Sequence, residues 1–334
     1  MGTASSVKFL TLADWAKRVD PKGGIDTIVE LLSESNPMIQ DASVIMGNLP
    51  TGHRHTERTT VASGTWRLLN KGVAETRTTT EQKDDQCGML EAFSAIDADL
   101  VSLAGNAAAF RLSEDMGFIS GLSNDAETAI ISANALTDPE KMHGFLPRYN
   151  LTTGTPGSTQ VIDGAGTTAL TSVWLITWGP KLNTLIFPQG SQAGLKTEDL
   201  GNRPWDDSSG NPYMAWVTHY QWKLGLAVHD YRYVVRICNI GSSALTTDAS
   251  TGVDLMEKMV KAYFRRGPTE GMSNLARTFW YCNKTVAEYL SHQAANKSNV
   301  YLNISNPAGE PIMSFYGIPI HICDQIGVAE TEVS

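Results

Sequence analysis

Residues 55–85 carry the sequence HTERTTVASGTWRLLNKGVAETRTTTEQKDD, which is rich in threonine and in charged side chains. Two extended runs flank Asn70, and the Lys71-Gly72 step predicts a hairpin turn because glycine tolerates positive φ. The apolar side chains that could anchor such a hairpin are few, namely Val61, Trp66, Leu68, Leu69 and Val73. A two-stranded hairpin alone is marginally stable in water. The segment is therefore either a flexible surface loop or an arm that lies across another subunit.

The longest helical pattern of the chain follows at residues 106–135, where Asn106 is a good N-cap. Apolar residues recur at spacings of mostly three and four, and they are Phe110, Leu112, Met116, Ile119, Leu122, Ala126, Ile130 and Ala133. A continuous helix would be roughly 40 Å long at about 1.5 Å per residue, which suits a strut. Gly117 and Gly121 lower helix propensity, so a kink or break is the competing interpretation.

The N-terminal residues 10–36 predict short helices with one apolar stripe each. Thr11 and Asp14 form a start signal before Trp15, and Asn36 with the proline that follows it ends the second apolar run. Such stripes pack either on the body of the same chain or on a neighbouring copy.

The rest of the chain alternates between apolar runs typical of buried strands and polar loops. The strand segments are SVWLITWGP (172–180), LNTLIFP (182–188), YMAWVTHYQWKLGLAVHD (213–230) and YRYVVRICNI (231–240), and the predicted loops are 151–171 and 190–211. The last third interleaves a helix at 254–266, a strand at 277–283, a helix with a capping box at Thr285 and Glu288, and strands at 299–304 and 311–326. This interleaving predicts a small α/β unit.

The composition narrows the class of function. The net charge is −9 and the isoelectric point about 5.3, and such acidity argues against tight binding of nucleic acid. The four cysteines lie far apart without a CxxC pair, so neither a zinc site nor a disulfide framework is expected. The sequence has no evident signal peptide and no apolar run approaching about 18 residues, so no membrane span is expected.

Known catalytic motifs do not occur. There is no Walker A loop, GxGxxG, GxSxG or HExxH sequence, so no catalytic, cofactor-binding or metal-binding residue is predicted. His53 and His55 could lie on one side of a strand as two metal ligands, but the cationic Arg54 and Arg58 beside them would repel a metal ion. A metal-dependent enzyme is therefore a secondary alternative.

Many segments, taken in order, resemble the major capsid proteins of certain short-chain tailed phages. They are TLADWAKR (11–18), VELLSESN (29–36), GNLPTGHRHTERT (47–59), GTWRLLNKGV (64–73), AAFRLSEDMGFISGL (108–122), GFLPRYN (144–150), VWLITWGP (173–180), FPQGSQAGLKTEDLG (187–201), THYQWKLGLAVHDYRYVVRICNI (218–240) and SFYGIPIHICDQI (314–326). Single segments are weak, but together they cover nearly the whole chain. The resemblance implies the α+β phage-capsid fold that tailed phages, encapsulins and herpesvirus shell floors share.

The resemblance also implies how the chain is divided. The expected parts are an N-terminal arm (1–47), an E-loop hairpin (48–92), a spine helix with the start of the P domain (93–150), P-domain strands and loops (151–245) and an α/β A domain (246–334). Two strand segments, at 173–180 and 231–240, resemble P-domain strands that most relatives place after the A domain, so the connectivity is expected to be permuted. Because each hairpin of this family lies on the spine helix of a neighbour, the candidate intersubunit contacts are Trp15, Arg58, Trp66, Arg67, Lys71, Arg77, Glu114 and Asp115.

The expected function is structural. Hexamers and pentamers of the chain would close into an icosahedral head around double-stranded phage DNA. The expected partners are further copies of the chain, portal and scaffolding proteins, a cement protein where one exists, and packaged DNA through weak non-specific contact. The chain would be part of the virion after assembly in the host cytoplasm. An encapsulin-like nanocompartment shell is the alternative, which would share the fold but enclose protein cargo.

Overall fold

The computed structural model describes residues 36–103, 106–207, 209–242, 245, 253–268, 275–296, 302–305 and 312–334. The predicted N-terminal helices and Trp15 lie outside the described residues. The chain divides into two compact units. The first unit consists of Met1–Glu34, Met89–Ala126 and Gly194–Lys223, and the second of Ser35–Gly88, Glu127–Ala193 and Leu224–Ser334.

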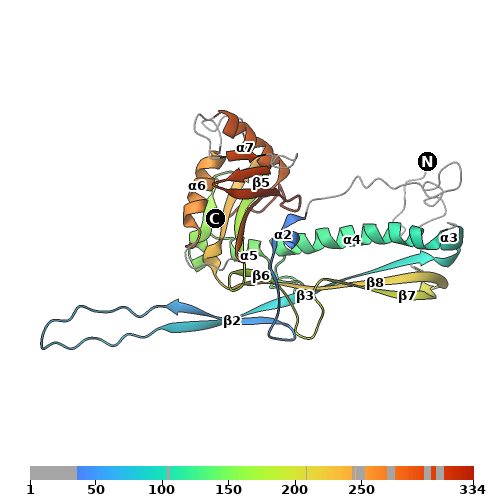
Figure 1. The fold of residues 1–334 in the computed structure, drawn as a ribbon, viewed down its shortest axis with the longest axis horizontal. Helices are drawn as coiled ribbons and strands as arrows, with labels where there is room; N and C mark the ends of the chain where they lie inside the picture. The colour runs from blue at the N-terminus through green and yellow to red at the C-terminus, as the bar shows by residue number, and fades with distance from the viewer. Residues whose placement is uncertain are drawn as a thin grey trace. The chain divides into compact units, whose positions relative to one another are not determined.

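A mixed β-sheet is the framework of the second unit (Figure 1). Its strands are β1 (Val44–Met46), β2 (Gly52–Thr60), the first part of β3 (Thr79–Asp97), β4 (Val161–Asp163), β5 (Leu170–Trp178), β6 (Asn183–Phe187), the last part of β8 (Pro212–Val228), β9 (Val234–Gly241), β10 (Arg277–Cys282), β11 (Leu302–Ser305), β12 (Ile312–Phe315) and β13 (Ile318–Ile322). The neighbours follow the order β11-β12-β13-β10-β5-β6-β8-β3-β2, so β2 is an edge strand. Every residue of β5 is buried, which explains why its central run Val173–Ile176 is apolar without alternation.

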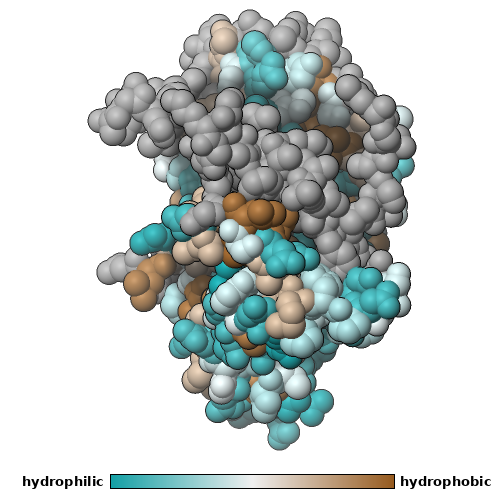
Figure 2. Space-filling view, turned by 90° about the vertical axis from the view of Figure 1, so that its right-hand side faces the viewer, coloured by the Kyte–Doolittle hydropathy of each residue, from teal (hydrophilic) through white to brown (hydrophobic). Residues whose placement is uncertain are grey.

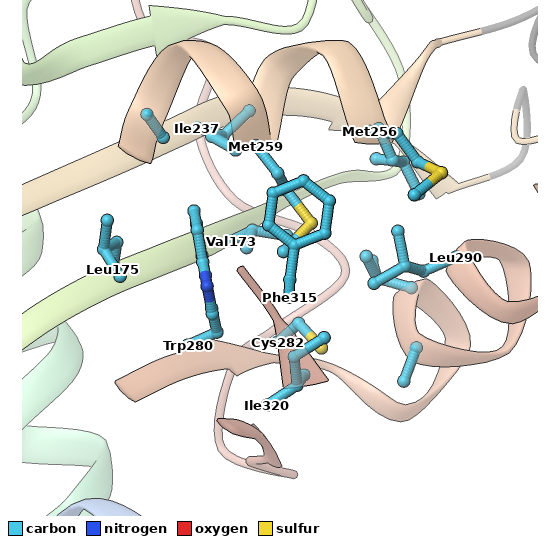
Figure 3. Close-up of a cluster of buried hydrophobic side chains, with 14 of the residues drawn as sticks. Val173, Leu175, Ile237, Met256, Met259, Trp280, Cys282, Leu290, Phe315 and Ile320 are labelled. Carbon is cyan, nitrogen blue, oxygen red and sulfur yellow. The ribbon is translucent and has the colours of Figure 1, made fainter. Parts of the chain in front are cut away.

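Two helices complete the core of this unit. The helices α6 (Leu255–Arg265) and α7 (Lys284–Asn296) pack with β5, β9, β10, β12 and β13 around one cluster of buried apolar side chains. Figure 3 shows part of this cluster, in which Met259 and Phe315 lie close to Trp280. The Trp280 and Phe315 rings meet edge to face, with centroids 5.9 Å apart. Strands expected for the P domain thus share one core with those expected for the A domain, and the boundary at 245/246 stays a prediction.

The described chain enters the second unit through the short helix α2 (Pro37–Asp41). The Met38 N–H donates to the fully buried Glu127 carboxylate over 3.2 Å, and the Cys323 thiol donates to the same oxygen over 3.0 Å. Burial raises the pKa of Glu127 to about 7. Asp41 lies 2.6 Å from His321 Nδ1. Both ends of the described chain are therefore held by polar contacts.

The C-terminal residues are also fixed to this unit. Glu330 pairs with Arg236 over 2.8 Å, and both side chains are almost fully buried. The Arg236 guanidinium also lies 5.2 Å from the centre of the Trp174 ring. Asn239 and Val333 exchange two hydrogen bonds, of 2.8 and 2.9 Å. The last residues are thus part of the core.

The first unit contains α3 (Ala98–Leu103), most of α4 (Ala107–Ser132), β7 (Leu195–Asp206), the second part of β3 and the larger part of β8. The Asn106 side chain accepts the Ala109 N–H over 3.2 Å, which confirms the predicted N-cap. The helix is continuous through Gly117 and Gly121, and its 26 residues give a length of about 40 Å. The Arg111 guanidinium pairs with Asp199 over 2.8 Å and fastens α4 to β7.

Several local predictions were wrong. Residues 190–211 contain β7, which pairs antiparallel with β8 from Leu195↔Trp222 to Asp206↔Pro212. Most of β7 is exposed, so its sequence lacks an apolar alternation. The predicted loop at 151–171 contains the 3-10 helix η1 (Pro156–Gln160) and β4. The capping box predicted at Thr285 and Glu288 is misplaced. Helix α7 begins at Lys284, and the side chain of Asn283 accepts the Thr285 N–H.

Candidate intersubunit surface

The hairpin predicted from the threonine-rich segment is present. Strands β2 and β3 pair antiparallel from Gly52↔Gln86 to Thr60↔Thr79, with one irregularity near Arg58. The turn lies two residues earlier than predicted: the Lys71 N–H donates to the Leu68 carbonyl, and Asn70 adopts the positive φ of 63°. Asparagine tolerates this conformation better than most residues, so Gly72 is not needed for it. Figure 1 shows the two chains of the hairpin side by side, joined at the tip.

Polar side chains tie the two strands together. Arg54 binds Asp84 with two hydrogen bonds of 2.6 Å, and this pairing lowers the pKa of Asp84. The hydroxyl groups of Thr59 and Thr60 lie 2.7 and 2.6 Å from that of Thr79. Cross-strand threonine and ion pairs are a known way to stabilise antiparallel strands. These contacts hold together the paired part of the hairpin, from Gly52↔Gln86 to Thr60↔Thr79, whereas residues 61–78 form no paired strand.

The tip of the hairpin, residues 61–78, exposes its apolar side chains. Trp66 is 101% exposed and Leu69 is 87% exposed, while Val61, Leu68 and Val73 are exposed by more than half. Side chains of this kind are normally buried, and a group of them on one segment marks an interaction site. The predicted contact residues Arg67, Lys71 and Arg77 are exposed on the same tip, and Arg58 is exposed on β2.

Helix α4 carries a second exposed apolar surface, which the sequence did not reveal. The predicted stripe is divided: Phe110, Leu122, Ala126, Ile130 and Ala133 are buried, as expected. Leu112, Met116 and Ile119 are instead exposed at 62%, 54% and 40%, and their spacing places them on one face. Figure 2 views the molecule from the side of α3 and shows hydrophobic residues scattered among hydrophilic ones on that side.

The two acidic residues predicted on this helix are half-buried. Asp115 lies beside the buried Tyr220, and burial together with this carboxylate raises the pKa of the Tyr220 hydroxyl. Asp115 thus faces its own unit at least in part, while Glu114 is also only half-exposed.

The described residues were also compared with the features of metal sites, membrane-spanning helices and reactive thiols. Among the residues described here, no group of three or more histidine, cysteine or acidic side chains is arranged to hold a metal ion. None of the described helices is long and apolar enough to cross a membrane. Burial raises the pKa of the Cys87 and Cys238 thiols to about 11, so both are protonated and unreactive at neutral pH.

A stiff projecting hairpin with an apolar tip, on a mixed α+β body with a long helix, defines a class of subunits that build capsid shells. Comparison with known proteins identifies the family. The family model described as major capsid protein GP7 matches residues 20–334, and the chain belongs to this family. It is a phage capsid protein and a component of the virion shell.

A solved phage structure agrees with this assignment. The bacteriophage Epsilon15 structure is similar with a TM-score of 0.78 and 31% sequence identity, over 98% of both chains. The bacteriophage JBD30 capsid has a TM-score of 0.49 and 11% identity, over 89% of this chain and 93% of the other. The SrpI encapsulin from Synechococcus elongatus has a TM-score of 0.43 and 11% identity, over 69% and 96%. No curated protein sequence matches the chain.

Proposed function

We propose that this capsid protein assembles into hexamers and pentamers by laying the hairpin of one copy across the adjacent copy, in a shell that encloses double-stranded DNA. The observation that carries the proposal is the exposed apolar tip around Trp66. Burial of these exposed apolar side chains on a neighbouring copy would favour association, because it removes their surface from water.

The surface that receives the tip is the exposed face of α4 on the neighbour. Leu112, Met116 and Ile119 offer apolar area of matching kind. The tip carries Arg67, Lys71 and Arg77 against the single acidic residue Glu75. On α4, Glu114 and Asp115 supply the opposite charge. Such complementarity selects the register and the partner more than it adds affinity.

The remaining roles follow from the same assignment. Residues 48–92 act as the E-loop, and residues 93–150 contain the spine helix. The chain acts without catalysis, and assembly takes place in the host cytoplasm with scaffolding and portal proteins. The net charge of −9 supports only weak, non-specific contact with packaged DNA.

Electron microscopy of the purified full-length protein tests the proposal directly. Closed shells or rings of six and five copies are expected, with density of one hairpin over the α4 of the next copy. A protein that stays monomeric at high concentration, with and without a scaffolding protein, would refute it. Particles from infected cells that contain DNA would support a phage head, whereas particles filled with protein would favour a nanocompartment.

A further inference from the structure

The root of the hairpin brings together three histidine rings. His53 and His55 project from one face of β2, as their i,i+2 spacing predicts, and their ring centroids lie 6.4 Å apart. The ring of His229, which follows β8, lies 5.1 Å from His53 and 4.8 Å from His55. The His229 N–H donates to the Leu182 carbonyl over 2.8 Å, which fixes this residue to the body. The three rings therefore form a contact between an edge strand and the rest of the second unit.

Two carboxylates border the three rings, and each is already paired with a cation. One oxygen of Glu57 lies 3.1 Å from His55 Nε2, and the other accepts from Lys83 over 2.7 Å. One oxygen of Asp85 lies 3.5 Å from His55 Nδ1, and the other accepts from Arg148 over 2.7 Å. The two acidic and two basic side chains cancel, so no net negative charge is left to balance additional imidazolium ions.

The other charged groups nearby do not change this balance. Asp84 is paired with Arg54, and Asp230 is paired with Arg232 over 2.7 Å. Burial lowers the pKa of His143, which would add a further positive charge in acid. Burial and the neighbouring rings likewise lower the pKa of His53 and His229, so these rings are neutral at pH 7.

We propose that His53, His55 and His229 form an acid-sensitive joint at the root of the hairpin. At neutral pH the rings pack β2 against the body. In acid, protonation of His53 and His229 places two cations, with ring centroids 5.1 Å apart, in a partly buried site beside carboxylates that already pair with Lys83 and Arg148, and β2 separates from His229. Strand β2 is the edge strand of the sheet and pairs with β3 on one side. Its separation from His229 therefore does not disrupt hydrogen bonds to a strand on the other side. The effect on shells rests on the proposed role of the hairpin, whereas the joint itself does not.

Hydrogen exchange of the full-length protein at pH 7.5 and pH 5.0 tests the joint, with rates corrected for the intrinsic effect of pH. Protection of peptides from β2 and from residues 79–88 should fall at least tenfold in acid, while peptides from β5 and β9 stay protected. The double variant His53→Gln/His229→Gln should keep its protection at pH 5.0. The matched control His292→Gln replaces an exposed histidine on α7 and should respond like the wild type. Equal protection of the wild type at both pH values, or an unchanged acid response in the double variant, would overturn the proposal.

A second measurement needs no substitution. NMR titration of the wild-type protein with isotope-labelled histidine should show the midpoints of His53 and His229 below the ordinary value of about 6.5. Titration of both rings at or above that value would also overturn the proposal, even if the double variant does not fold. A Trp66→Ala variant should keep the acid response, so a failure of assembly and a failure of the joint can be told apart.

Discussion

Replacing Trp66 with alanine separates assembly from folding. Trp66 is fully exposed in the single chain, so the variant should change the free energy of unfolding by no more than about 0.5 kcal/mol. An aromatic side chain buries about 150–250 Å² when it is covered, which at about 25 cal/mol per Å² corresponds to about 4–6 kcal/mol. If half of the side chain is covered on the neighbour, each contact loses about 2–3 kcal/mol. That loss weakens each contact roughly 30- to 150-fold.

The assay compares two quantities on the same protein. Light scattering against protein concentration gives the threshold for assembly, and urea unfolding followed by circular dichroism gives the stability of the unassembled chain. The matched control is Leu136→Ala, which removes a side chain that is 87% exposed and lies outside the hairpin. The threshold should rise for Trp66→Ala only. An unchanged threshold, or an equal loss of stability and assembly, would refute the assignment of the tip as an intersubunit contact.

Three further predictions concern the core and the helix. As the pH rises from 5 to 8, the free energy of unfolding of the wild type, measured in urea, should fall by up to about 3 kcal/mol relative to that of Glu127→Gln. The folded state holds the Glu127 proton up to about pH 7 and the unfolded state only to about 4.5, so this contribution is lost as the pH rises through 7; a difference that does not vary with pH would contradict it. Glu330→Ala leaves Arg236 buried without its carboxylate and should cost about 3–5 kcal/mol in denaturant unfolding; a loss below about 1 kcal/mol would contradict this. The double variant Leu112→Ser/Met116→Ser should raise the assembly threshold without changing the unfolding midpoint, and a lower midpoint with unchanged assembly would show that these side chains stabilise only their own unit.

Local signals predicted the elements whose stability is local. The helix predicted at 254–266 follows from residues within one segment, and the structure confirms it as α6 (Leu255–Arg265), with Asp254 as its N-cap. The hairpin was predicted from what it lacks, namely an apolar face, and the exposed tip agrees with the arm interpretation. Strand β7 was not predicted from the sequence. It is stabilised by hydrogen bonds to β8, and its exposed, polar sequence has no apolar alternation that would indicate a strand.

The burial of the α4 side chains and the position of His229 depend on tertiary contacts. Leu112 and Leu122 belong to one apolar series in the sequence, yet one is exposed and the other buried, because only part of α4 faces its own unit. His229 is far from His53 along the chain and meets it only because β8 ends beside β2. No spacing rule could have predicted either arrangement from a single sequence.

The paired strands of the hairpin and the histidines at its root affect assembly in different ways. The strand contacts hold the hairpin together, whereas protonation at the root would release it from the body. The threonine contacts and the Arg54–Asp84 pair keep the strands together, so the tip can be positioned without losing much conformational entropy. A rigid arm transmits any change at its base to its tip. At that base, however, the chain places His53 and His229 beside two carboxylates, Glu57 and Asp85, which already contact His55 and pair with Lys83 and Arg148. Position of the tip should therefore be controlled at the root, and a substitution at Trp66 should change the strength of the contact without changing the pH at which the hairpin moves.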